Sequence, residues 1–397
     1  MDENGKDTQK KITGFVLQGG GALGAFELGV IECLLDSGIS PDVVSGVSIE
    51  AVNATVLCGH RHDDPKVSLH ALWDDLTTLS IPFAPDMVNA KISIFGNPGM
   101  YTPRYDFFNF FHWTSYYNTA PLVETLEKHV DFGKLKPGTK APRLILTATN
   151  IGTGKLEIFD SHRMQITPHH VLASGSLPPG FPATKATAPP DSDGTEHLYW
   201  DGGLFDNTPL SKVIDALQED ETPDKWVWVV NLFPSGGTAP ANMAEVNDRM
   251  IAILFSNKME KDLKQAGKVT NLIELFEKFD RVMSVIDKED RKLKELVAHN
   301  RDEIDKLARP HGLNLETLIQ AYQDLKALTT SDGYKAVKKY GSRIRIVPIT
   351  NDDVSGGSDF SAARIRQRRE MGYQAAANAI REEISGKQKK VSDKESP

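Results

Sequence analysis

The fold of this chain is decided by Val44-Ser45-Gly46-Val47-Ser48-Ile49-Glu50-Ala51-Val52. A short apolar, β-branched strand ends here in Gly-x-Ser, and a helix-forming pattern follows at once. This order predicts a nucleophile elbow, which is a sharp strand-to-helix turn that exposes Ser48 near the positive end of the new helix. The alternative interpretation is that Ser48 is an ordinary N-cap of a core helix.

A glycine run, Gln18-Gly19-Gly20-Gly21-Ala22-Leu23-Gly24-Ala25-Phe26, follows the strand-like residues Ile12–Leu17. Backbone N–H groups of such a run converge on an anion. A dinucleotide site would need an acidic residue at the end of the second strand. Asp42 has the right spacing but precedes that strand. The run therefore favours an oxyanion hole for an attacked ester carbonyl over a nucleotide site.

The third motif is Tyr199-Trp200-Asp201-Gly202-Gly203-Leu204-Phe205-Asp206-Asn207-Thr208-Pro209. It places a carboxylate on a tight loop after a short aromatic strand. Alone it indicates a turn, which Asp-Gly-Gly forms readily. Together with the elbow it indicates a general base, because a serine hydroxyl attacks poorly until a neighbouring base takes its proton.

In chain order these motifs resemble those of the patatin-like phospholipases, particularly bacterial members with an added C-terminal region. The resemblance covers about residues 12–235. It also includes Ala173-Ser174-Gly175-Ser176-Leu177-Pro178-Pro179-Gly180-Phe181-Pro182 and the Asn-x-Pro at 207–209.

The resemblance implies a lipid acyl hydrolase with a Ser–Asp dyad and no histidine. Ser48 would then be the nucleophile, Asp201 the base, and the N–H groups of Gly19, Gly20 and Gly21 the oxyanion hole. Acyl lipids or related esters would be the substrates, and no cofactor would be needed. The supporting motif residues are Gly24, Gly46, Glu50, Gly202 and Gly203.

Two residues depart from the family pattern. Leu23 stands where plant patatins carry a basic residue. Glu50 stands at the elbow glycine, where a Cβ atom would collide with the strand behind the turn. A carboxylate facing the oxyanion would also impair catalysis. The alternative function is therefore a catalytically weak patatin-fold protein that binds acyl lipids or a protein partner.

Strands and helices alternate along the chain, which predicts an α/β fold with a mainly parallel sheet between two helical layers. The best strands are Ile12–Leu17, Val43–Ser45, Arg143–Thr149, Trp226–Leu232 and Arg343–Ile349. The expected domains are a tail at 1–11, a catalytic domain at 12–240, a charged helical insertion at 241–340, a final strand and helix at 341–384, and a disordered tail at 385–397.

Two segments carry further expectations. Residues 81–118 are rich in aromatic side chains, which would either line an acyl pocket or pack on the core. The helix predicted from Ala362 to Glu383 carries four arginines, for which a solvated face is expected over a lipid-contacting one.

Composition excludes several classes of protein. The 397 residues carry a net charge of −8, which argues against nucleic acid as a partner. No apolar run reaches about 18 residues, and the polar start has no signal-peptide pattern. We expect a cytoplasmic enzyme, at most peripheral at a membrane or lipid inclusion.

The metal-binding residue types give little signal. Cys33 and Cys58 fall in apolar helical patterns typical of small buried residues. The histidines lack metal-ligand spacing. The sequence thus predicts no metal or cofactor and leaves the oligomeric state open.

Overall fold

The computed structural model describes residues 11–78, 92–106, 111–222, 224–234, 239–240, 246, 249–250, 252–256, 261–264, 267–268, 271, 273–281, 283–284, 302, 306, 315–339 and 344–395. The chain divides into two compact units. The first comprises Met1–Asp220, Lys225–Asp262 and Arg345–Pro397, and the second comprises Glu221–Asp224 and Leu263–Ile344.

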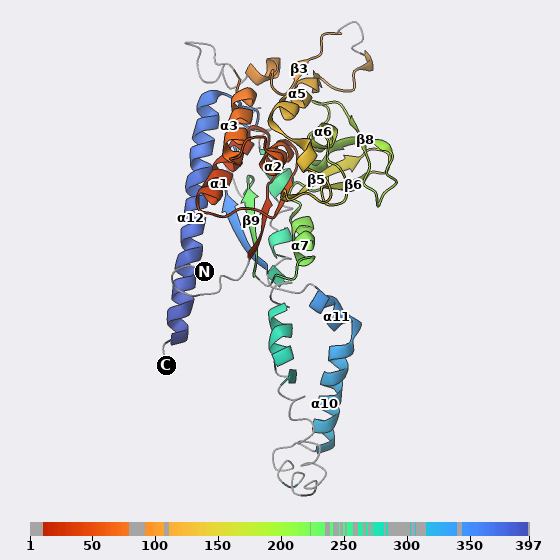
Figure 1. Ribbon diagram of the computed structural model, residues 1–397, viewed down its shortest axis with the longest axis vertical. Helices are drawn as coiled ribbons and strands as arrows, with labels where there is room; N and C mark the ends of the chain where they lie inside the picture. The colour runs from red at the N-terminus through yellow and green to blue at the C-terminus, as the bar shows by residue number, and fades with distance from the viewer. Residues whose placement is uncertain are drawn as a thin grey trace. The chain divides into compact units, whose positions relative to one another are not determined.

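An eight-stranded mixed sheet forms the centre of the first unit (Figure 1). Its strands follow the order β10-β9-β1-β2-β5-β8-β7, and β6 pairs with β5. Their bounds are β1 Lys11–Val16, β2 Val43–Gly46, β5 Arg143–Asn150, β6 Lys155–Asp160, β7 Thr184–Thr187, β8 Glu196–Asp201, β9 Asp224–Asn231 and β10 Ile344–Thr350. A separate two-stranded sheet pairs β3 (Thr102–Pro103) with β4 (Tyr117–Asn118). All five predicted strands are confirmed within about two residues at each end, whereas β6 and β7 were not predicted.

Helices flank this sheet, as the α/β prediction required. The α-helices of the first unit are α1 Gly24–Asp36, α2 Ile49–Gly59, α3 Pro65–Leu76, α5 Ala120–His129, α6 Pro168–Ser174, α7 Leu210–Gln218 and α12 Ala362–Glu395. Helix α7 packs on β1 and β2, α2 on β2 and β5, and α6 on β5, β7 and β8. Figure 1 shows α12 running along α1, which is the most extensive helix pairing in this unit.

Short one-turn segments complete the first unit: η1 Gly21–Leu23, η2 Ile92–Phe95, η4 Phe132–Lys134 and η5 Gly202–Leu204. Two of them, η1 and η5, lie inside the predicted motifs. The glycine run therefore turns into α1 through η1, and the Asp-Gly-Gly motif forms the start of η5.

Helix α12 extends beyond its predicted end. It continues to Glu395 through residues expected to be a disordered tail. That stretch is rich in lysine, which has high helix propensity, and it contains no proline that would stop the helix.

In the second unit, α10 (Leu315–Thr330) and α11 (Asp332–Lys339) are the helices with defined bounds. Tyr334 of α11 is 6% exposed and packs edge-on against Phe276 and Phe279. This small aromatic cluster fits the predicted helical character of the region, while the charged stretch from Lys288 falls mainly outside the described residues.

Candidate active site

The sheet register brings the predicted elbow and the predicted base to the same level. Gly46 at the end of β2 lies beside Leu146 of β5, so Ser48 follows two residues further on. Asp201 at the end of antiparallel β8 lies beside Ala148, two residues beyond Leu146 on the same strand. Ser48 and Asp201 therefore approach the same point from opposite directions.

Ser48 occupies a backbone conformation that side chains rarely adopt. Its φ of 62° and ψ of −132° make it the one non-glycine residue with positive φ in the described part of the chain. Such a conformation costs on the order of 1–3 kcal/mol and persists only where the surroundings impose it. Here the Ser48 N–H donates to the Ser174 carbonyl (3.0 Å) at the end of α6. Gly46 is required because a Cβ atom there would lie 2.2 Å from the Glu50 carbonyl oxygen.

Asp201 is 2% exposed, and its carboxylate is held by short-range contacts. Oδ1 accepts from the Gly203 N–H at 2.7 Å, and the Ser48 hydroxyl is close enough to the carboxylate to lower its pKa. Burial raises the pKa of Asp201 to about 7, although the Gly203 amide and the Ser48 hydroxyl both oppose that shift. Among the described residues, the groups that favour the ionised carboxylate are thus a backbone amide and the predicted nucleophile, with no histidine involved.

The two glycines after Asp201 allow a close approach to neighbouring groups. A Cβ atom on Gly202 would stand 2.4 Å from the Thr147 carbonyl oxygen of β5. A Cβ atom on Gly203 would stand 2.7 Å from Oδ1 of Asn207. The Asp-Gly-Gly motif is therefore more than a generic turn, since side chains at either glycine would displace the aspartate.

The amides of the glycine loop, residues 18–21, do not all face one direction. Gly19 N–H donates to the Asn207 carbonyl at 3.3 Å, and Gly20 N–H donates to Oε2 of Glu50 at 2.9 Å. Gly21, with a φ of 60°, has no acceptor for its N–H among the described residues. Gly19 lies close to the elbow, because a Cβ atom on it would be 3.3 Å from the Ser48 Cβ. The oxyanion role of these three amides stays a prediction.

Glu50 neither reaches solvent nor deforms the elbow. Its side chain is fully buried beneath the glycine loop, and Oε1 stands 2.8 Å from where a Cβ atom on Gly24 would be. Gly24 therefore leaves the space that Glu50 occupies. Burial raises the pKa of Glu50 well above its usual range, and the negative charge of Glu27 adds to the increase.

Sequence reasoning missed residues that brace the loop from distant segments. Asn207 Nδ2 donates to the Gly19 carbonyl at 2.7 Å, reciprocating the amide contact. Arg368 of α12 is 1% exposed and donates to the carbonyls of Ala22 (3.1 Å), Ser355 (2.9 Å) and Gly356 (2.6 Å). The expected solvated face is thus wrong for Arg368, since backbone carbonyls satisfy its charge. Arg366 on the same helix is exposed.

The aromatic segment, residues 81–118, contacts the residues that follow Ser174. Tyr101 and Tyr117 pack against Phe181 with ring centroids 5.2 and 5.9 Å apart. Tyr101 is buried, whereas Tyr105 and Phe111 are exposed. Packing on the core is therefore confirmed for Tyr101, while the lining of an acyl pocket stays a prediction. Phe83, Phe107, Phe108 and Phe110 lie outside the described residues.

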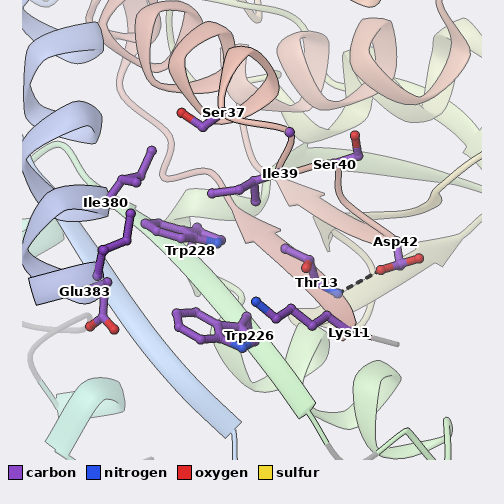
Figure 2. Close-up of a pocket in the computed structure, with 12 residues that line it drawn as sticks. Lys11, Thr13, Ser37, Ile39, Ser40, Asp42, Trp226, Trp228, Ile380 and Glu383 are labelled. Carbon is purple, nitrogen blue, oxygen red and sulfur yellow. Dashed lines mark hydrogen bonds between the residues drawn. The ribbon is translucent and has the colours of Figure 1, made fainter. Parts of the chain in front are cut away.

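A cavity of about 510 Å³ lies at the other end of β1, away from the glycine loop. Figure 2 shows Trp228 of β9 near Ile39 and near Ile380 of α12, with Trp226 beside Lys11. The two indole rings are stacked at 6.2 Å, and Lys11 lies over Trp226. Neither Ser48 nor Asp201 lines this cavity, so it is not part of the predicted site.

Features of other classes of site are lacking in what the structure describes. No group of three or more His, Cys, Asp or Glu side chains gathers in a metal-binding arrangement among the described residues. Cys33 and Cys58 are buried free thiols, as predicted. Of the described helices, none combines the length and apolar character needed to span a membrane.

Comparison with known proteins defines the class to which this fold and site belong. A sequence profile of the patatin-like phospholipases matches residues 15–214, about half of the chain, and the chain belongs to that family.

Its similar proteins include two from Saccharomyces cerevisiae. Triacylglycerol lipase 5 is 24% identical over 242 residues, and triacylglycerol lipase 4 is 25% identical over 234 residues. Each alignment covers 54% of this chain but only 30% and 24% of the respective relative. The chain therefore spans less than a third of the length of these relatives. VipD from Legionella pneumophila is 15% identical with a TM-score of 0.38, over 94% of this chain and 67% of VipD.

Proposed function

We propose that this protein is a serine hydrolase of lipid-like acyl esters, in which Ser48 is the nucleophile and Asp201 the base. One observation carries the proposal. A serine held in a strained elbow lies close enough to a buried carboxylate to lower its pKa, and that pKa is about 7. A base with a pKa near the working pH is best suited to take a proton and return it.

The reaction would proceed in two half-reactions. In the first, Ser48 Oγ gives its proton to Asp201 and attacks the ester carbonyl, and the resulting oxyanion is stabilised by glycine-loop amides. Asp201 then gives the proton to the departing alcohol. In the second, water gives a proton to Asp201 and attacks the acyl-Ser48 ester. Asp201 then returns that proton to Ser48 Oγ as the carboxylic acid departs, which restores the serine and the carboxylate.

Apolar side chains around the dyad support an acyl substrate. Leu204 and Phe205 follow Asp201 within four residues and are 45% and 50% exposed. Leu177 is 37% exposed and follows Ser176, whose carbonyl accepts from the Asp201 N–H. Exposed apolar groups of this kind next to a polar centre are typical of sites for amphipathic ligands.

The family and the names of the yeast relatives both support a lipid hydrolase, and the relatives' names point to triacylglycerol. Phospholipid, lysophospholipid, monoacylglycerol and hydroxyalkanoate oligomers are equally compatible with a Ser–Asp dyad. We expect the protein to work in the cytoplasm and to contact lipid surfaces transiently. The competing function is a catalytically weak patatin-fold protein that binds acyl lipids or a protein partner, and it would follow if Glu50 withheld the Gly20 amide from the oxyanion.

Hydrolysis of a chain-length panel of p-nitrophenyl esters tests the proposal. Ser48→Ala should lower kcat by at least about 10³-fold, because it removes the nucleophile. Ser45→Ala is the matched control: Ser45 is buried three residues earlier, and its hydroxyl has no hydrogen-bond partner among the described residues. A fluorophosphonate should label the wild type and Ser45→Ala but not Ser48→Ala. Equal hydrolysis by wild type and Ser48→Ala would disprove the proposed mechanism.

A further inference from the structure

Two buried carboxyl groups lie directly beneath the glycine loop. Glu50 extends from the first turn of α2, and Glu27 extends from the first turn of α1. Both side chains are 0% exposed. Glutamate is almost never buried to this extent without specific partners, so each of the two carboxyl groups is expected to have one.

The partners of both carboxyl groups are backbone amides of the loop. Oε1 of Glu27 accepts from the Gln18 N–H at 2.9 Å, and Oε2 of Glu50 accepts from the Gly20 N–H at 2.9 Å. The amide between them, Gly19 N–H, instead donates to Asn207. Alternate amides of the loop are therefore fixed by the two carboxyl groups, while those of Gly19 and Gly21 are not used by them.

The two carboxyl groups are electrostatically coupled. Burial raises the pKa of both, and for Glu50 the charges of Glu27 and Asp201 raise it further. The Gly20 amide opposes this increase at Glu50, and the Asn53 side chain opposes it at Glu27. The charged groups that face Glu50 in the described structure are thus both acidic. Two neighbouring buried carboxyl groups cannot both ionise readily, which favours the protonated form.

We propose that Glu50 is a positioning residue: its carboxyl group, beside that of Glu27, anchors the glycine loop from behind through the Gly20 amide and so leaves the Gly21 amide, which has no acceptor among the described residues, for the oxyanion. The inference rests on the proposed hydrolase function for its kinetic part. Its structural part, the anchoring of Gly20, is independent of that function. Glu50 thereby takes over a place that the elbow motif otherwise gives to glycine.

Amide hydrogen exchange tests the anchoring without any assay of activity. Glu50→Ala removes the acceptor of the Gly20 N–H, so exchange in residues 18–22 should accelerate at least about tenfold. Glu50→Gln keeps an oxygen for Gly20 and resembles the protonated acid, so exchange should stay near the wild-type rate. Glu32→Gln is the matched control, since Glu32 is a buried carboxylate on α1 that binds Arg369 and His70 instead of the loop. Unchanged exchange in Glu50→Ala would overturn the proposal.

Kinetics provide the second test. Glu50→Ala should lower kcat by about 10- to 100-fold with KM within about twofold, because the oxyanion donors lose their alignment. Glu50→Gln should retain kcat within about threefold. Glu32→Gln should leave kcat and KM unchanged.

Two kinetic outcomes would overturn the proposal. If Glu50→Ala hydrolyses faster than the wild type, the carboxyl group competes with the oxyanion for the Gly20 amide. If Glu50→Gln loses as much activity and thermal stability as Glu50→Ala, Glu50 only fills space. A wild type that neither hydrolyses esters nor reacts with a fluorophosphonate would instead contradict the hydrolase function, and the exchange test of Gly20 would still stand.

Discussion

The carbonyl oxygen of Phe26 in α1 lies 1.9 Å from the point where a Cβ atom on Gly372 of α12 would stand. The relationship is reciprocal, since a Cβ atom on Gly29 of α1 would lie 1.8 Å from the Arg369 carbonyl oxygen of α12. Both obstacles are backbone atoms, which cannot swing aside. The two helices are therefore in backbone contact at a pair of glycines, and α12 is held firmly along α1.

Gly372→Val should strongly destabilise the protein, because α12 must move away from α1 to make room for the side chain. Overpacking of this kind costs about 3 kcal/mol of unfolding free energy. Urea denaturation measures the change. Gly152→Ala is the control, since the nearest atom, Oδ1 of Asn150, is 3.4 Å from the added Cβ. Equal losses in the two variants would contradict backbone contact between the helices.

Activity should depend on pH through Asp201. Because its pKa is about 7 and the base must be ionised to accept the Ser48 proton, kcat/KM should rise about tenfold per pH unit below pH 7 and level off above it. The measurement is ester hydrolysis between pH 5 and pH 9, with correction for spontaneous hydrolysis. A profile that is flat between pH 5 and pH 8 would show that another group is the base.

Stability should show the opposite dependence on pH. The pKa of Asp201 is raised from 3.8 to about 7, so its contribution to stability is complete below pH 3.8 and is lost as pH rises through 7. Asp201→Asn avoids the cost of a buried charge and still offers an oxygen to Gly203. At pH 8 the variant should therefore have an unfolding free energy a few kcal/mol larger than that of the wild type, and a higher Tm. Both differences should shrink toward pH 4. A Tm difference that is independent of pH would refute this origin.

Arg368→Met should weaken both the fold and the site. It removes charged hydrogen bonds to three segments of backbone, including the Ala22 carbonyl at the glycine loop, and about 3 kcal/mol is a reasonable loss for these bonds. We expect a lower Tm and a lower kcat with the glycine loop less well supported. Arg366→Met on the exposed face of the same helix is the control, and parallel behaviour of the two variants would argue against a specific role for Arg368.

The sequence predicted those parts of the fold and site that depend on local pattern. The strand before Ser48 and the helix after it follow from apolar runs and turn residues, and the elbow is found where Gly46 places it. The strands β6 and β7 were missed because their residues are largely polar or alternately exposed. Helix α3 begins at Pro65 because Asp64 caps it by accepting from the Lys66 N–H.

Contacts between distant segments were not predictable from one sequence. Glu50 was expected to crowd the elbow, point to solvent or bind a neighbour, and only the packed structure shows that it turns under the glycine loop. Arg366 and Arg368 lie two residues apart in the same arginine-rich stretch, so no local sequence signal distinguishes the buried arginine from the exposed one. Its partners at Ser355 and Gly356 become visible only when α12 is placed beside α1.

Arg368 donates to the carbonyl of Ala22, which lies 346 residues earlier in the chain, so this contact can form only late in synthesis. At about 5–20 residues per second, the ribosome needs roughly 20 to 70 s to extend the chain from one residue to the other. During that interval the segment that carries Ser48 already exists, but the arginine that braces the glycine loop does not. The nascent chain therefore carries the proposed nucleophile long before the arginine that braces the glycine loop, and the proposed site is complete only once α12 has been made.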